Sequence, residues 1–225
     1  MKTKIFLIAA VLFSSFMFSQ DSLEITHQKT RLVAVTPLNN KVSTVNGLAF
    51  GLGLDSQYLF KEETALKLQK VNGLNLEVNP LGILFWFFHD PSRIKNVETV
   101  QVNGLNISPA GYLRGISHNG AGISLYNYGH TMNGAMVSLA NFDIEKGNGV
   151  FVAVLGVSSR EMTGLSLAAF NDAEILRGVQ IGLVNHNIDG KGLQIGLVNK
   201  SKRMKGLQIG FWNKNGKRAL PLINF

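Results

Sequence analysis

Histidine and carboxylate side chains are the groups in this sequence whose types could bind a metal ion or transfer a proton. The five histidines are His27, His89, His118, His130 and His186. None has a partner at the spacing of a metal-binding helix or strand. His89 and Asp90 are adjacent, so on a strand their side chains would point to opposite faces. The fourteen Asp and Glu residues are scattered without an acid–base pair. We therefore expect no metal, no cofactor and no enzymatic activity.

The sequence evidence for a nucleophile or a phosphate-binding loop is equally weak. Ser124 and Ser138 both occupy the small-residue position of a repeat, which favours packing over nucleophilic chemistry. The segment Gly47-Leu-Ala-Phe-Gly-Leu-Gly53 resembles a phosphate loop only superficially, because it lacks the lysine and the following helix. The chain contains no cysteine, which excludes disulfides, thiolate chemistry, cysteine-ligated zinc and a lipoprotein anchor.

A short repeat dominates the second half of the chain. It is clearest in Gly178-Val-Gln-Ile-Gly-Leu-Val-Asn185, Gly192-Leu-Gln-Ile-Gly-Leu-Val-Asn199 and Gly206-Leu-Gln-Ile-Gly-Phe-Trp-Asn213. Weaker copies begin at Gly120, Gly134, Gly149 and Gly164, and three Val-Asn-Gly-Leu segments begin at Val45, Val71 and Val102. A fixed period of 14 to 16 residues, punctuated by glycine, indicates a β-rich repeat architecture.

Each copy, numbered from its first glycine, alternates in character. Positions 2, 4 and 6 are mostly aliphatic, position 5 is small, and position 8 is usually Asn. The alternation predicts a strand whose aliphatic positions face the core, with close packing or a bend at position 5 on the other face. A second apolar site lies two residues before the glycine, as in Val45 and Met204. The Asn-Gly step in the earlier copies is typical of a turn with positive φ.

We read one repeat as one coil of about 14 residues, and the array as an all-β solenoid in which equivalent residues stack in ladders. The alternative is an antiparallel β-meander closed into an outer-membrane-type barrel. It is favoured by the lack of charge at positions 1–8 of the seven copies and by the terminal aromatic Phe225. Against it, three outward aliphatic positions cover only about 13 Å, where an outer-membrane barrel needs about 25 Å.

The remaining segments complete the expected organisation. Residues 1–19 form a signal peptide, with Lys2 and Lys4 before an apolar run and Ser19 before the cleavage site. Residues 20–44 form an N-terminal segment or cap, 45–111 the irregular repeats, 112–216 the regular repeats and 217–225 a C-terminal strand or cap. The run 80–91 is a further cap candidate, because repeat arrays need atypical ends.

The three Gly-Leu/Val-Gln-Ile-Gly units and the ending Lys217-Arg-Ala-Leu-Pro-Leu-Ile-Asn-Phe225 resemble the surface-repeat family of spirochaetes and Bacteroidetes-type Gram-negative bacteria. The resemblance covers roughly residues 45–225. It implies export to the cell surface or outer membrane, with the periplasm left open, and it carries no enzyme activity or functional residues. Gly156 in place of the corner Asn, and Glu77 at a small position, depart from the pattern.

One charge cluster is either a solvated edge that keeps the array soluble and prevents aggregation through strand edges, or a candidate binding site. Eight basic residues fall between Asp189 and Arg218 against that single acid, a net charge of 8 − 1 = +7. They are Lys191, Lys200, Lys202, Arg203, Lys205, Lys214, Lys217 and Arg218. We call these residues the basic segment. The expected function is a non-catalytic structural or adhesion module that binds lipopolysaccharide or acidic polysaccharide, not nucleic acid, through this edge; a barrel acting as a pore or scaffold is the alternative.

Overall fold

The structure is a computed structural model that describes residues 29–54, 68–78, 88, 98–112 and 115–225. The expected signal peptide and nearly all of the run 80–91 lie outside these residues. The strands within the described residues are β1 (Lys29–Thr36), β2 (Val42–Gly51), β3 (Gln69–Glu77), β4 (Val100–Tyr112), β5 (Ile116–Ser138), β6 (Asn141–Ala153), β7 (Gly156–Leu167), β8 (Phe170–Asn215) and β9 (Arg218–Asn224).

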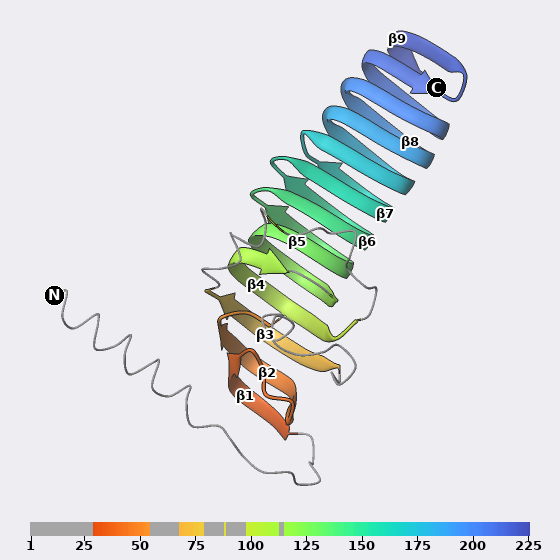
Figure 1. Ribbon diagram of the computed structural model, residues 1–225. Coiled ribbons are helices and arrows are strands. Elements are labelled where there is room, and N and C mark those ends of the chain that lie inside the picture. Colours follow the sequence, from red (N-terminus) through yellow and green to blue (C-terminus); the bar gives the residue numbers. More distant parts are fainter. Residues whose placement is uncertain (1–28, 55–67, 79–87, 89–97, 113–114) are drawn as a thin grey trace, which may run out of the picture.

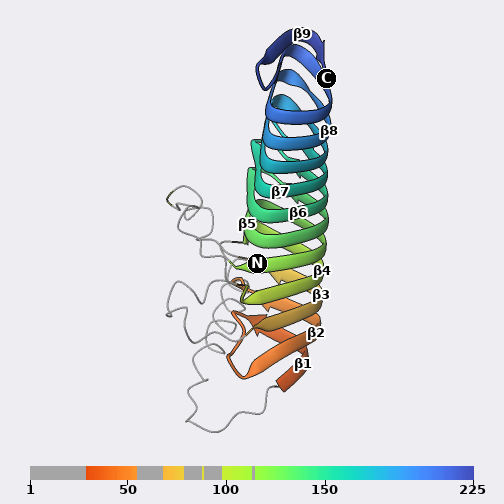
Figure 2. The same cartoon turned by 90° about the vertical axis from the view of Figure 1, so that its right-hand side faces the viewer.

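The chain winds into a stack of coils, with each strand paired to its neighbours in chain order (Figures 1 and 2). Every pairing from β1 to β8 is parallel, and equivalent repeat positions face each other, as in Gly73 opposite Gly104 and Gly149 opposite Gly164. The predicted β-solenoid is therefore confirmed. The antiparallel meander, with the closed barrel it would form, is wrong because the pairing is parallel.

The orientation of the repeat strand is the reverse of the one expected. Positions 3 and 5 point into the coil, so Gln194 is fully buried, whereas Leu197 at position 6 is 58% exposed. The prediction that the aliphatic positions form the core is therefore wrong. The physical reason for the reversed orientation is that the inward polar side chains form hydrogen bonds to the equivalent residues of the next coil, which removes the usual penalty for burying them.

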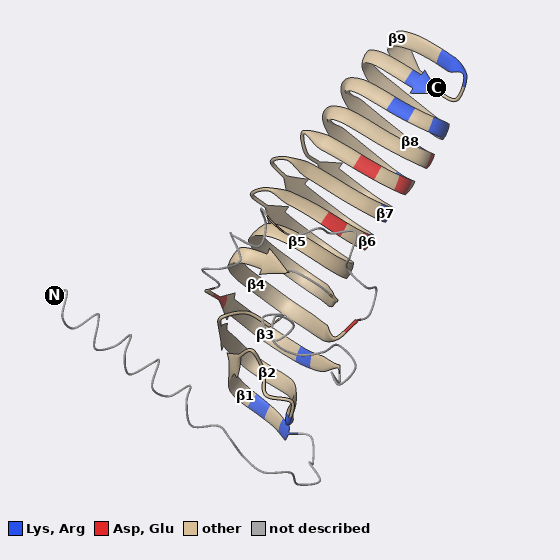
Figure 3. Ribbon diagram, in the orientation of Figure 1, with Lys and Arg blue, Asp and Glu red and all other residues tan. Residues whose placement is uncertain are grey.

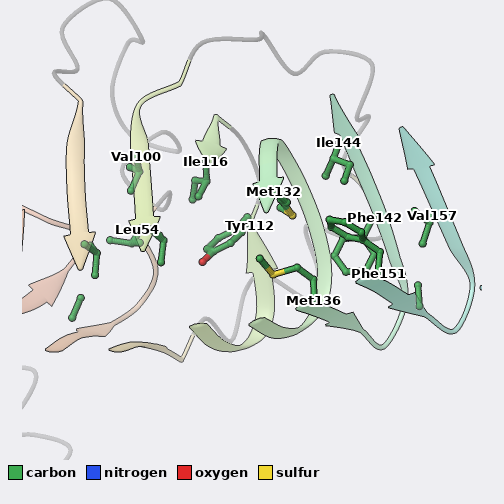
Figure 4. Close-up of a cluster of buried hydrophobic side chains, with 14 of the residues drawn as sticks. Leu54, Val100, Tyr112, Ile116, Met132, Met136, Phe142, Ile144, Phe151 and Val157 are labelled. Carbon is green, nitrogen blue, oxygen red and sulfur yellow. The ribbon is translucent and has the colours of Figure 1, made fainter. Parts of the chain in front are cut away.

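Aliphatic and aromatic side chains do fill the coils nearer the N-terminus (Figure 4). Phe151, at position 3, meets Phe142 of the opposite wall edge-on, with ring centroids 5.5 Å apart. The apolar site two residues before the glycine is buried as predicted, for example at Val102, Met132 and Leu176. The buried apolar side chains therefore form one cluster that extends from β1 to the beginning of β8.

Amide ladders replace this core in the C-terminal coils. Asn171, Asn185, Asn199 and Asn213 form one buried chain of side-chain hydrogen bonds, with donor–acceptor distances of 2.7–2.9 Å. Gln208 donates to Gln194, which donates to Gln180, at 2.7 and 2.8 Å. These bonds join residues 14 apart, so they fix the register of the coils within β8.

Two corners shape each coil. The first is the glycine at position 1, which has positive φ in every copy, such as 140° at Gly192. A Cβ there would lie 1.9 Å from the carbonyl oxygen of Gly178, so no side chain fits. The second corner follows position 6 and absorbs one additional residue in the coils that begin at Gly104, Gly134 and Gly149.

This additional residue corrects the sequence alignment of two copies. Gly156 pairs with Phe170, whereas Val157 stands opposite Asn171. The site of the missing ladder Asn is therefore Val157 and not Gly156. Since Val157 has no amide to donate, the Oδ1 atom of Asn171 is buried without a hydrogen-bond partner among the described residues.

The two ends of the described stack differ. At the start, β1 pairs in parallel with β2, and its first five residues are exposed. At the other end the chain turns at Gly216, and β9 returns antiparallel along residues 208–215 of the last coil. Pro221 and an irregular register lie within β9, two features that discourage further strand pairing.

Candidate functional site

The basic segment lies on the outside of the last coils. All eight of its side chains are exposed, and Figure 3 shows several blue positions on the last coils. Lys200 and Lys214 occupy position 9, just beyond the second corner. Lys191 and Lys205 occupy position 14, just before the first. Because equivalent positions stack at about 4.8 Å per coil, these lysines form two short columns.

Most of these cations have no acidic partner among the described residues. Arg203 lies 3.3 Å from the carboxylate of Asp189, and the Arg218 guanidinium stacks 4.6 Å from the centre of the Phe225 ring. The six lysines of the basic segment form no ion pair with any described residue. The structure therefore leaves most of the segment's positive charge available to a partner.

The coils immediately upstream are built differently. Arg160 binds both Glu145, at 2.5 Å, and Glu161, at 2.6 Å, and Lys146 lies 3.8 Å from Glu161. Positive and negative side chains alternate there from coil to coil and neutralise one another. The excess of positive charge therefore begins in the coil that starts at Gly178 and contains Lys191.

A second candidate surface consists of the outward side chains at positions 2, 4 and 6, which we call the apolar face. Its central column is Phe50, Leu76, Ile107, Ile123, Val137, Val152, Leu167, Ile181, Ile195 and Ile209. The outer column includes Leu183, Leu197 and Phe211, the last of which is 76% exposed. No charged residue occupies these positions in the seven regular copies.

The dimensions of the apolar face mark it as unusual for a surface. Ten rungs at about 4.8 Å extend about 43 Å, and three outward positions span about 13 Å. The resulting area is on the order of 550 Å², near the upper end of the largest apolar patches on monomeric proteins, about 300–600 Å². Patches of this size are often interaction sites.

Sequence reasoning missed this surface, although the sequence held a signal for it. Position 3 carries Gln in the three clearest copies, and a Gln that alternates with aliphatic residues reads as outward under the usual hydrophobic rule. The signal for the apolar face was the absence of charge from positions 1–8, since an ordinary solvated strand face would carry Lys or Glu.

The histidines are placed as structural residues where the structure describes them. His118 is buried, with Nε2 3.0 Å from the carbonyl oxygen of Gly104 and Nδ1 3.4 Å from the Tyr112 hydroxyl. Burial lowers the pKa of His118, although the Gly104 contact partly offsets it. The Gly104 carbonyl accepts from Nε2, so Nδ1 of the neutral ring accepts from Tyr112.

His130 and His186 have local partners of their own. His130 Nδ1 lies 2.9 Å from the hydroxyl of Thr131. His186 pairs with Asp172 of the preceding coil at 2.6 Å, both at position 9 and both substantially exposed. His27 and His89 lie outside the described residues.

Glu77 is the one carboxylate buried in the position-5 column of the described coils. Its Oε1 atom accepts hydrogen bonds from the backbone of Leu54 and from Asn75, both at 2.9 Å. Burial raises the pKa of Glu77, and the hydrogen bonds from Asn75, Leu54 and Ser108 partly offset the rise.

Within the described ranges, no group of three His, Cys, Asp or Glu residues is placed to hold a metal ion. No helix in that part of the chain has the length and hydropathy to cross a membrane. No family model matches the chain, and no curated protein or solved structure matches it.

Proposed function

We propose that the chain is a non-catalytic exported module that binds anionic polymers of the bacterial envelope, lipopolysaccharide or acidic polysaccharide, through the basic segment. The observation that carries this proposal is the set of six exposed lysines, at the C-terminal end of the stack, that form no ion pair with any residue the structure describes. Export and a surface or outer-membrane location are expected from residues 1–19 and from the resemblance to surface-repeat proteins.

The composition of the basic segment favours a diffuse anion over a single phosphate pocket. Six of its eight cations are lysines, which attract anions without the fixed two-pronged geometry of arginine. The column positions repeat with the coil, so the segment offers a charged strip to a partner that is itself repetitive. A phosphate- or carboxylate-bearing polymer has that property.

Replacement of Lys200, Lys202, Arg203 and Lys205 by Gln tests the proposal. The variant should elute from heparin and lipopolysaccharide columns at clearly lower salt than the unmodified chain, because exposed charges act over only about 10 Å at 0.1 M salt. The same elution salt for both proteins would contradict the proposal.

The chain offers a matched control at its other end. Lys29, Arg31, Lys41 and Lys70 also comprise three lysines and one arginine, but they are distributed over β1–β3 and the turn between β1 and β2. Their replacement by Gln removes the same total charge. The control should elute closer to the unmodified chain than the basic-segment variant does.

A further inference from the structure

We infer that the apolar face binds the acyl chains of lipopolysaccharide, so that the stack lies lengthwise on the lipid while the lysines contact its phosphates. This inference rests on the proposed function and extends it from an anionic polymer to an anionic amphiphile.

The two walls of the coil differ sharply in their outward side chains. Positions 2, 4 and 6 are apolar, as at Leu193, Ile195 and Leu197, whereas the return part of the same coil carries Lys200, Lys202 and Arg203. The C-terminal coils are therefore amphipathic across their thickness. A surface with one apolar side and a basic polar side is the general form of elements that lie in a membrane interface.

Lysines border the apolar face along both of its long sides in these coils. Lys191 and Lys205 precede its first column, and Lys200 and Lys214 follow the second corner. A lysine has a long alkyl stem and a charged tip, so it can lie along an apolar surface while its ammonium group reaches a phosphate. This arrangement complements a ligand in which phosphates surround acyl chains.

Charge disfavours a second copy of this chain as the occupant. Two copies facing each other in the same direction would bring two basic segments together. Two copies in opposite directions would bring each basic segment to the end formed by β1–β3, which carries Lys29, Arg31 and Lys70. Like charges meet in both arrangements, whereas an anionic lipid surface attracts both ends.

The experiment compares lipopolysaccharide with its deacylated form, which keeps the phosphates and sugars but lacks the acyl chains. The unmodified chain should bind the acylated form at least about tenfold more tightly, a difference of about 1.4 kcal/mol. Leu183→Gln combined with Leu197→Gln should remove that preference and leave binding to the deacylated form unchanged. Equal affinity of the unmodified chain for both forms would overturn the inference.

A matched variant controls for the loss of aliphatic side chains. Ile175→Gln with Ile188→Gln changes two residues on the return part of the coil, away from the apolar face. This variant should keep the full preference for acylated lipopolysaccharide. If it loses the preference as the Leu183/Leu197 variant does, the apolar face is not the acyl-binding surface.

The outcomes separate the inference from the proposed function. Loss of binding to both forms in the Lys200/Lys202/Arg203/Lys205 variant, without any acyl preference in the unmodified chain, supports the proposed function alone. Light scattering of the unmodified chain adds a third readout. A stable dimer that the Leu183/Leu197 substitutions dissociate would assign the apolar face to a second copy and overturn the inference.

A tryptophan probe tests the same contact without altering the polarity of the face. Leu197→Trp and, separately, Ile188→Trp are placed in a chain whose Trp86 and Trp212 are Phe. Brominated acyl chains in lipopolysaccharide-containing vesicles should quench Trp at 197 and leave Trp at 188 largely unquenched. Equal quenching at the two positions would contradict the proposed orientation.

Discussion

The side chain of Asn185 donates a hydrogen bond to Oδ1 of Asn199 at 2.8 Å, although the two residues are 14 positions apart in the sequence. Asn185 also donates to the backbone carbonyl of Ile195 at 2.8 Å, and Asn171 and Asn199 bond in the same way, so these three residues join the side chain and the main chain of the next coil. Stability in the C-terminal coils therefore depends on amide pairing where most proteins depend on aliphatic packing.

Asn199→Leu should destabilise the chain by more than its small change in volume suggests. Asn199 donates to the carbonyl of Ile209 and to the buried Oδ1 of Asn213, and its loss leaves both acceptors without that donor. An unsatisfied buried polar group costs about 1–3 kcal/mol. Urea unfolding measures the loss. Asn148→Ala, which removes one exposed ladder bond to Asn133, is the control and should cost less. Equal losses would show that burial of the ladder is irrelevant.

Gly196→Ala should destabilise the chain through a direct collision. A Cβ at Gly196 would lie 2.4 Å from the carbonyl oxygen of Gly182 and 2.6 Å from the side-chain Nδ2 atom of Asn185. Overpacking of this kind costs about 1–3 kcal/mol. Gly156→Ala is the control, because its nearest contact would be 3.3 Å, from Phe170. Thermal melts that rank Gly156→Ala as the more harmful change would refute this account.

Glu77→Gln should raise stability at neutral pH and flatten its pH dependence. Burial raises the folded-state pKa of Glu77 above its unfolded value. The contribution of Glu77 is therefore present at low pH, below the unfolded pKa, and is lost as pH rises through the folded pKa. Free energies of unfolding at pH 4 and pH 8 should show a smaller decrease in the variant than in the unmodified chain. Exposed Glu174→Gln should leave the decrease unchanged.

Removal of residues 217–225 should convert the chain into end-to-end oligomers. β9 covers the edge of the last coil, and without it the backbone groups of residues 208–215 would be free to pair with another chain. Size-exclusion chromatography with light scattering measures the assembly state. Phe225→Ala, which keeps β9 and removes only the ring contact with Arg218, should give the same assembly state as the unmodified chain.

The period of the repeat predicted the fold because it constrains the stacking directly. Equal spacing of Gly178, Gly192 and Gly206 requires each unit to occupy an equivalent place, and a 14-residue unit fits one coil. The buried site two residues before the glycine was predictable for the same reason: Val102 and Met204 are apolar in otherwise polar surroundings.

The inward direction of the strand could not be read from alternation alone. Alternation shows that Leu193 and Ile195 share a face, and that Gln194 lies on the other, but a one-residue shift exchanges the two faces. The burial of Gln194 becomes favourable only after the coils are stacked, because its partners Gln180 and Gln208 belong to neighbouring coils. The apolar face was missed because this pairing is not local. The exposure of the lysines needed no such information.

The regular 14-residue coil makes the length of the molecule adjustable in fixed steps. Deletion of residues 192–205 would join Lys191 to Gly206. Gln208 would then lie opposite Gln180 and Asn213 opposite Asn185, so each would exchange its present partner for one of the same residue type. Such a deletion shortens the stack by about 4.8 Å and removes four of the eight basic residues. Gain and loss of whole units during evolution can therefore change the reach and the charge of the molecule together, without redesign of either end.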